Sequence, residues 1–298
     1  MSAYDPHRWT SHLFDIEGSM IREILGRVSL CVAWSAIVVS LYKFGPPMFR
    51  SFTIPETAHA LLGPSLGLLL VFRTNSSYDR YWEGRKQWGS IINESRNLAR
   101  QSEIWLAGDR RLVDRIIRWT VAYGFATMHR LRSESSLGDV PLGLPEDEVQ
   151  AVAHAEHVPL AVARKITSIT HHAQMEGLID TTQRRSMDDN VQVLVDCCGA
   201  CERIRSTPAP YAYVVHLRRA LIVYCLTLPL ALVERYEWET ILVTLMTAYI
   251  LFGIEEIGVE IENPFSYTIN DLPLDGLCAT IRRDLTGILD KPTDKVAL

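Results

Sequence analysis

The residues best suited to metal or redox chemistry are cysteines and histidines in the middle of the chain. They form three short groups: Cys197, Cys198 and Cys201; His154 and His157; His171 and His172. A zinc site on the CxxC pair needs a second pair of ligands, and a thioredoxin-like site needs a surrounding βαβ pattern. Neither is present, and the histidines lack the HExxH spacing that puts two ligands on one helix face. We therefore predict buried structural cysteines, solvated histidines, no metal and no cofactor.

Carboxylates gather at one further place, at the end of the last long apolar run. They are Glu255, Glu256, Glu260 and Glu262. Because carboxylates at a helix C-terminus oppose the macrodipole, they predict either an exposed polar face or an ion-attracting rim, with Glu255 and Glu256 as the rim candidates. The sequence contains no P-loop, GxSxG or GxGxxG motif, so motifs identify no catalytic residue.

Four long runs are apolar and free of formal charge. They are residues 28–42, 57–72, 220–233 and 241–254. Each is shorter than the roughly 20 residues that span a bilayer core, and runs of about 10–14 more often form buried core helices. All four are apolar around the whole helix rather than along one stripe, so periodicity does not separate the two alternatives.

The charges that flank these runs favour membrane insertion. The link Lys43–Glu56 carries two basic residues and one acid, and Glu234–Thr240 carries three acids and one arginine. Basic residues collect instead before the first run, after the second and before the third: Arg8, Arg22, Arg27, Arg73, Arg80, Arg85, Lys86, Arg203, Arg205, Arg218 and Arg219. By the positive-inside rule we predict a multi-pass protein of the cell membrane with both termini in the cytoplasm.

The predicted membrane helices cover about residues 25–44, 54–73, 212–234 and 239–257. We assign residues 74–211 and 258–298 to a cytoplasmic helical region of the same subunit, because apolar residues such as Trp88, Ile91 and Leu98 recur at helical spacing. No strand alternation appears, so the predicted fold class is all-α. The net charge of −5, without a long basic run, argues against a nucleic-acid partner.

Four motifs, in the same order along the chain, resemble the bestrophin family. The longest is FRTNSSYDRYWEGRKQWG at Phe72–Gly89. Leu13-Phe14-Asp15, Cys201-Glu202-Arg203 leading into Thr207-Pro208-Ala209-Pro210-Tyr211, and Glu262-Asn263-Pro264-Phe265 are the others. Together they cover nearly the whole chain, and its length is similar to that of the bacterial branch, which implies the bacterial inner membrane.

This resemblance implies a homopentameric ion channel, which needs no enzymatic activity. The partners are then further copies of the chain, the lipid bilayer and small monovalent permeant ions; the family favours chloride and other anions, and sodium or another cation is the alternative. The second membrane helix of each subunit would line an axial pore, with a hydrophobic neck at Pro64, Leu68 and Phe72. Pro64 departs from the family, which has a larger apolar side chain there. The cytoplasmic pore exit falls near Thr182.

The resemblance also points to a calcium clasp, which this chain retains only in vestigial form. Its positions correspond to Asn263, Asn270 and Asp271, with Asp271 as the one carboxylate in the loop after Phe265. Calcium prefers six to eight oxygen ligands, usually several carboxylates, so we predict that the clasp binds no calcium. Two other functions remain open: a soluble or peripheral all-α metal-dependent enzyme using His154, His157, His171 or His172, and a membrane scaffold that binds partners.

Overall fold

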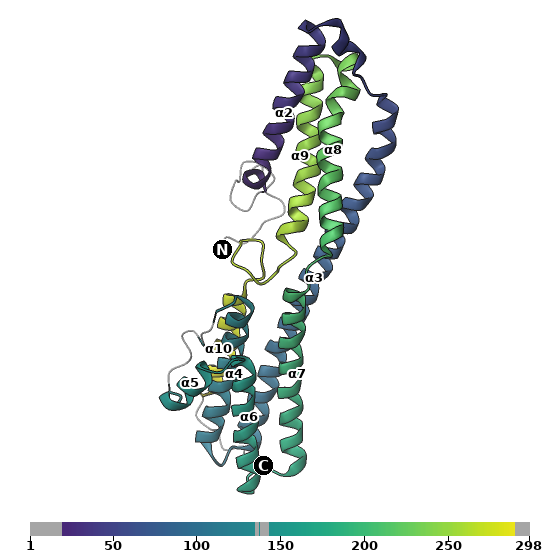
Figure 1. Cartoon of the computed structure of the whole chain (residues 1–298). Helices are drawn as coiled ribbons and strands as arrows, with labels where there is room; N and C mark the ends of the chain where they lie inside the picture. Colours follow the sequence, from purple (N-terminus) through teal and green to yellow (C-terminus); the bar gives the residue numbers. More distant parts are fainter. Residues whose placement is uncertain (1–19, 135–136, 138–142, 290–298) are drawn as a thin grey trace. The chain divides into compact units, whose positions relative to one another are not determined.

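The computed structural model describes residues 20–134, 137 and 143–289, and within them it contains helices and no strand. The elements are α2 (Ile21–Phe44), η1 (Pro47–Ser51), α3 (Glu56–Trp105), α4 (Arg110–Leu131), α5 (Glu146–Ala153), α6 (Val158–Met175), α7 (Thr181–Ser206), α8 (Tyr211–Tyr236), α9 (Glu239–Glu260) and α10 (Leu274–Leu289), as labelled in Figure 1. The predicted all-α class is confirmed. The motif Leu13-Phe14-Asp15 and both chain ends lie outside the described residues.

The described chain divides into two compact units. Unit 1 comprises the described residues up to Arg80, with Pro208–Asn263 and Thr268–Asn270; unit 2 comprises Tyr81–Thr207, Pro264–Tyr267 and the described residues from Asp271 onward. The division falls close to the predicted change from membrane helices to cytoplasmic region. Helix α3 contributes its first half to unit 1 and its second half to unit 2.

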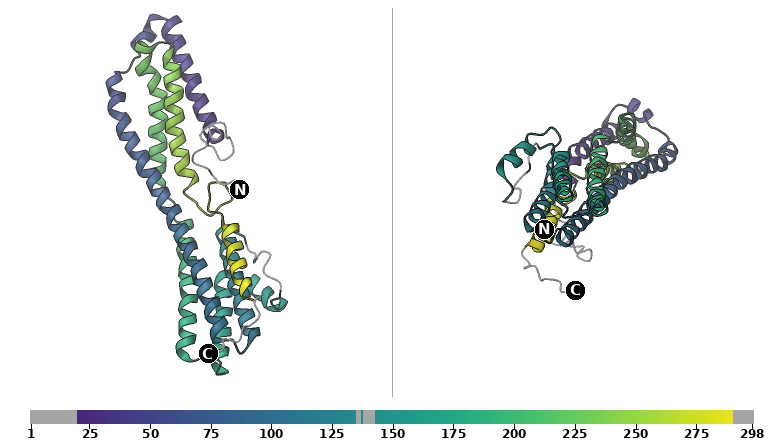
Figure 2. Two further views of the ribbon diagram at one scale, coloured as in Figure 1. Left: turned by 180° about the vertical axis from the view of Figure 1, so that it is seen from behind. Right: turned by 90° about the horizontal axis from the view of Figure 1, so that it is seen from below.

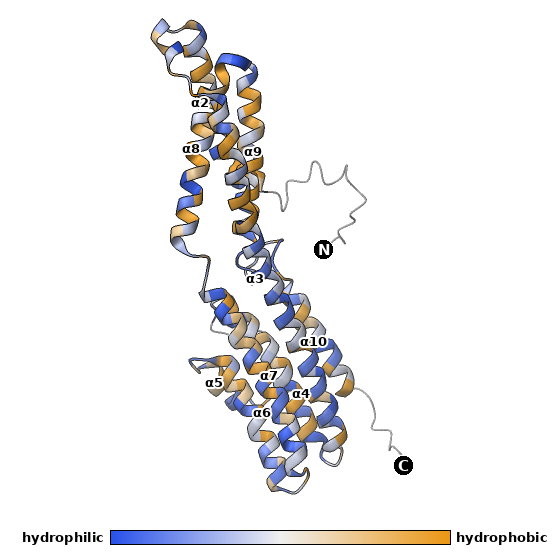
Figure 3. Cartoon of the chain, turned by 90° about the vertical axis from the view of Figure 1, so that its right-hand side faces the viewer, coloured by the Kyte–Doolittle hydropathy of each residue, from blue (hydrophilic) through white to orange (hydrophobic). Residues whose placement is uncertain are grey.

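Unit 1 is a bundle of α2, α8, α9 and the first half of α3. The views of Figures 1 and 2 agree in placing α2, α8 and α9 side by side, and side chains of these helices share one core with α3. That core contains Ile24, Val28, Cys31, Leu66, Leu70, Leu217, Leu221, Cys225, Ala248 and Phe252. Apolar residues such as Leu30, Val223 and Leu242 are also exposed on the outside of α2, α8 and α9. Figure 3 shows that large parts of these helices are hydrophobic.

Within the described residues, three helices are long and apolar enough to cross a membrane: α2, α8 and α9. They correspond to three of the four predicted spans. The remaining one, 54–73, is not a separate helix, because it forms the beginning of the 50-residue α3 and continues into charged residues without interruption. Its membrane insertion stays a prediction. At 1.5 Å per residue α3 is about 75 Å long, and Pro64 lies inside it.

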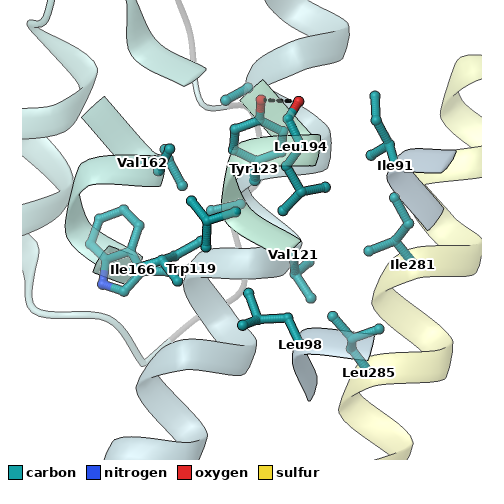
Figure 4. Close-up of a cluster of buried hydrophobic side chains, with 14 of the residues drawn as sticks. Ile91, Leu98, Trp119, Val121, Tyr123, Val162, Ile166, Leu194, Ile281 and Leu285 are labelled. Atoms are coloured by element: carbon teal, nitrogen blue, oxygen red, sulfur yellow. Dashed lines mark hydrogen bonds between the residues drawn. The ribbon is translucent and has the colours of Figure 1, made fainter. Parts of the chain in front are cut away.

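Unit 2 packs α4 against α6, α7 and α10, with the second half of α3 supplying further core residues. Figure 4 shows its centre, where the Tyr123 hydroxyl donates to the Leu194 carbonyl oxygen at 2.7 Å. The side chain of Asp109 caps α4, and a capping box of Asp180 and Gln183 begins α7. All six cysteines carry free, buried thiols, as predicted for Cys197, Cys198 and Cys201.

Candidate functional site

One face of α3 in unit 1 points away from the packed helices. Leu68 and Phe72 are 56% and 58% exposed, and Pro64 is exposed one turn earlier. On the opposite side of the helix, Leu66 and Leu70 are 6% and 1% exposed and belong to the core. Residues at i, i+4 and i+8 lie near one helix face, so Pro64, Leu68 and Phe72 lie together on the outside of the unit.

The chemistry of this exposed surface changes along the helix. On the face of Leu68 and Phe72 the exposed residues change from apolar Leu61 to polar or charged Asn75, Ser76 and Asp79. Tyr78 and Trp82, which are also exposed, lie to either side of this face. In a membrane helix, an exposed apolar surface can face lipid, a neighbouring subunit or a constriction that excludes water. An exposed polar surface requires water or a polar partner. Phe72 therefore marks the boundary between two environments.

Immediately after Phe72, the side chain of Arg73 turns into the bundle. Arg73 is 1% exposed, and its Nη2 donates to Oε2 of Glu262 at 2.6 Å while Nη1 donates to Oγ of Ser77 at 3.1 Å. The other carboxylate oxygen of Glu262 accepts from the backbone N–H of Ala209 at 2.6 Å. Removing either charge would leave its partner buried and unpaired, which is strongly destabilising.

Glu262 joins three segments that are distant in sequence. Burial alone would raise the pKa of Glu262, but the hydrogen bonds from Arg73 and the Ala209 backbone hold that pKa below its usual value. Nε of Arg80 also donates to the Glu262 carbonyl oxygen at 3.0 Å. Sequence reasoning placed Glu262 among the terminal acids without pairing it. One signal in the sequence could have indicated this pairing. The four motifs contain all of the residues involved: Arg73, Arg80, Ala209 and Glu262.

The rim candidates Glu255 and Glu256 pair with arginines inside unit 1. Glu255 is 1% exposed and accepts from Arg218 Nε at 2.9 Å and from Arg27 Nη1 at 3.1 Å. Glu256 accepts from Nη2 of Arg27. Two arginines opposite two glutamates leave this cluster without net charge. The ion-attracting role stays a prediction, and the ion pairs reduce the negative charge that such a rim would present.

Thr182, the predicted pore exit, is exposed in the first turn of α7. The Asp180 carboxylate accepts from the backbone N–H of Gln183 at 2.8 Å, and the Gln183 side chain accepts from the backbone N–H of Asp180 at 2.9 Å. These reciprocal bonds fix the start of the helix. The side chain of Thr182 therefore projects from a rigid turn into solvent.

The three residues of the vestigial clasp lie in different surroundings. Asn263 is exposed, Asn270 donates from Nδ2 to Oε1 of Glu260 at 3.5 Å, and Asp271 is 6% exposed. Asn263 and Asn270 belong to unit 1, and Asp271 belongs to unit 2. The predicted loss of calcium binding is not tested by this placement.

The four histidines proposed for a metal-dependent enzyme do not form one group. His154, His171 and His172 are exposed, in line with the predicted solvated surface. His157 is half-buried at the N-cap of α6, whereas His171 and His172 lie in the last turns of that helix, about 20 Å away. His157 has ligand atoms of Cys198 and Glu202 within 4.8 Å of its own.

Comparison with known proteins places these features in a family. A family model described as bacterial and fungal bestrophin protein matches residues 1–287. The chain is 39% identical, over 94% of its length and 91% of the relative's, to a voltage-dependent anion channel-forming protein of Nostoc sp.. A protein of the same description from Synechocystis sp. is 38% identical, with 96% and 94% covered.

The fold also matches solved structures. A crystal structure of a bacterial bestrophin homolog from Klebsiella pneumoniae aligns with a TM-score of 0.84 at 28% identity. The alignment covers 90% of this chain and 99% of that one. The arrangement of helices is therefore shared along 90% of this chain.

Proposed function

The chain belongs to the bacterial and fungal bestrophin family, and from this premise we propose that it forms a homopentameric membrane channel for small monovalent anions. Each subunit contributes four membrane spans, with the beginning of α3 as the fourth beside α2, α8 and α9. Both termini and unit 2 lie on the cytoplasmic side. The excess of basic residues next to the predicted cytoplasmic ends of the spans supports this orientation.

The observation that carries the proposal is the exposed apolar face of α3. Leu68 and Phe72 lie more than half outside the packing of their own subunit, on a helix whose opposite side is fully buried. Five copies of this face around an axis would form a hydrophobic neck at Pro64, Leu68 and Phe72. Such a constriction can gate by losing water, and it needs no charged plug. The polar residues beyond Phe72 suit a wider, hydrated path that ends near Thr182.

The pairing of Glu255 and Glu256 supports anions over cations as the permeant species. Unpaired carboxylates facing the pore would attract cations. Here both glutamates interact with Arg27, and Glu255 also interacts with Arg218, so the cluster carries no excess negative charge. The description of the Nostoc and Synechocystis relatives as anion channel-forming proteins points to the same sign.

Chloride release from proteoliposomes tests the proposed function. We expect the purified protein to release trapped chloride when a membrane potential drives it outward, and protein-free vesicles to retain it. Native mass spectrometry of the same preparation should give the mass of five chains. Vesicles that hold chloride despite containing correctly assembled protein would contradict the channel function, and a stable monomer in mild detergent would contradict the pentamer.

A further inference from the structure

Three different potential metal ligands meet at the junction of α6 and α7 in unit 2. His157 occupies the N-cap of α6, and Cys198 and Glu202 lie at i and i+4 on one face of α7. One ligand atom from each of the three lies within 4.8 Å of the others. Nε2 of His157 and Oε2 of Glu202 are 3.3 Å apart. The fold thus brings a nitrogen, a sulfur and an oxygen ligand together from separate parts of the chain.

We propose that His157, Cys198 and Glu202 form a zinc-binding site with a water molecule in the fourth position. Zinc accepts imidazole, thiolate and carboxylate ligands at about 2.0–2.3 Å, so tetrahedral ligand atoms lie roughly 3.3–3.7 Å apart. The observed distance between the histidine nitrogen and the carboxylate oxygen already falls in this range. The sulfur lies within 4.8 Å of both other ligand atoms, so it must move by at most roughly 1.5 Å to reach the tetrahedral separation.

The Glu202 side of the site borders a surface pocket. The pocket is lined by Arg130, Ser133, Glu134, Glu202, Arg205 and Ser206. Nε of Arg130 donates to Oε1 of Glu202 at 2.7 Å, which orients the carboxylate and leaves Oε2 directed at His157. Such an outer partner holds a metal-binding carboxylate in place. The positive charge of Arg130 is offset by the Glu202 carboxylate and by the Cys198 thiolate that forms when zinc binds.

Cys198 lies on the buried side of the site, where only a bound cation would stabilise a thiolate. Burial raises the pKa of Cys198 to about 11, so the free protein carries a thiol at neutral pH. The fully buried Thr127 hydroxyl lies beside Cys198 and Tyr123, and its hydrogen bond to Cys198 favours the thiolate form. A zinc-bound thiolate would be a stronger acceptor for this hydroxyl than the thiol is. On binding, the S–H bond is replaced by an S–Zn bond, and one proton leaves to solvent.

Zinc also changes the protonation of His157. In the free protein Nδ1 of His157 accepts from the backbone N–H of Leu160 at 3.2 Å, which fits the tautomer whose Nε2–H donates to Glu202. Zinc on Nε2 requires the ring proton to move to Nδ1, which ends the cap on Leu160. Because Leu160 is 52% exposed, water can replace that bond. Zinc binding therefore competes with one helix cap, which moderates the affinity.

Cobalt(II), added alone to the purified full-length protein in detergent, is the probe for this site. We expect a thiolate-to-cobalt charge-transfer band that saturates at one ion per chain and disappears when zinc is added. Cys198→Ser should abolish the band. The matched variants Cys197→Ser and Cys201→Ser remove neighbouring buried thiols and should retain it. No saturable band, or a band that survives Cys198→Ser, would overturn the proposal.

A second variant keeps the test decisive if Cys198→Ser fails to fold. His157→Asn removes the imidazole and keeps an N-cap, because the asparagine side chain accepts from the first turn of a helix. We expect this variant to fold and to bind cobalt at least about tenfold more weakly, as is usual when a metal site loses a supporting group. His171→Ala, an exposed histidine away from the site, should bind like the wild type. Unchanged cobalt affinity in His157→Asn would refute the assignment.

Discussion

Truncating the exposed face of α3 should change ion conduction much more than stability. Leu68 and Phe72 are 56% and 58% exposed, so less than half of each side chain packs within its subunit. Truncating a fully buried leucine to alanine costs about 2–5 kcal/mol, and a large part of that cost reflects the cavity left behind. At these exposed positions no closed cavity forms, and we expect a loss of about 1 kcal/mol in the free energy of unfolding for Leu68→Ala.

Leu70 provides the matched control, since it lies on the same helix and is 1% exposed. Leu70→Ala should cost the full 2–5 kcal/mol, reducing the yield of assembled channel without altering the current through each molecule. Leu68→Ala and Phe72→Ala should instead assemble normally and give larger or longer-lived single-channel currents, because the widened neck stays hydrated. Pro64→Ala should have little effect on the current, because the proline side chain is already small and its truncation hardly widens the neck.

Single-channel recording in planar bilayers measures the current, and thermal unfolding of the same preparations in detergent measures the stability. Phe72→Ala should have the largest effect on current, because an aromatic ring fills more of the lumen than a leucine. If unitary conductance and open probability stay at wild-type values in both Leu68→Ala and Phe72→Ala, these residues do not line the pore. Their exposed face would then contact lipid or a neighbouring subunit.

Two further predictions concern carboxylates. Because the folded-state pKa of Glu262 lies below its usual value, its contribution to stability is present above the unfolded-state pKa of about 4.3 and is lost as the pH falls through the folded-state value. Glu262→Gln should therefore lower the free energy of unfolding by about 3 kcal/mol at pH 7. The difference between the variant and the wild type should shrink as the pH falls through the folded-state pKa of Glu262. Thermal unfolding that shows the same difference at pH 7 and in acid would contradict this prediction. Channel current should not respond to micromolar calcium; a rise that Asp271→Ala abolishes would show a functional clasp.

Local sequence patterns were sufficient to predict helices but not their continuity. The apolar run 57–72 and the periodic segment around Trp88 predicted separate helical regions, whereas both belong to α3. Where α3 passes through the charged motif, Arg73 and Ser77 are buried, and their side chains bond to each other and, through Arg73, to Glu262. That pairing is set by tertiary packing across 189 positions, which no local pattern contains.

Tertiary packing also explains why the sequence predicted no metal, whereas the structure led to the proposed zinc site. The sequence predicted no metal because the CxxC pair lacked a second pair of ligands nearby. The fold supplies His157 from α6, 45 positions from Glu202, and it selects Cys198 rather than the whole CxxC pair. His157 keeps 33% of its side chain exposed, so it lies at the surface as predicted, but it also caps a helix that packs against α7.

The reversal potential under asymmetric salt is the most direct test of the proposed anion channel. Purified protein in a planar bilayer separates two concentrations of sodium chloride, and the voltage of zero current is measured. An anion channel gives a reversal potential close to the chloride equilibrium potential, and the sign inverts when the gradient is reversed. A value close to the sodium equilibrium potential would show cation conduction, and the absence of any protein-dependent current would contradict the channel itself.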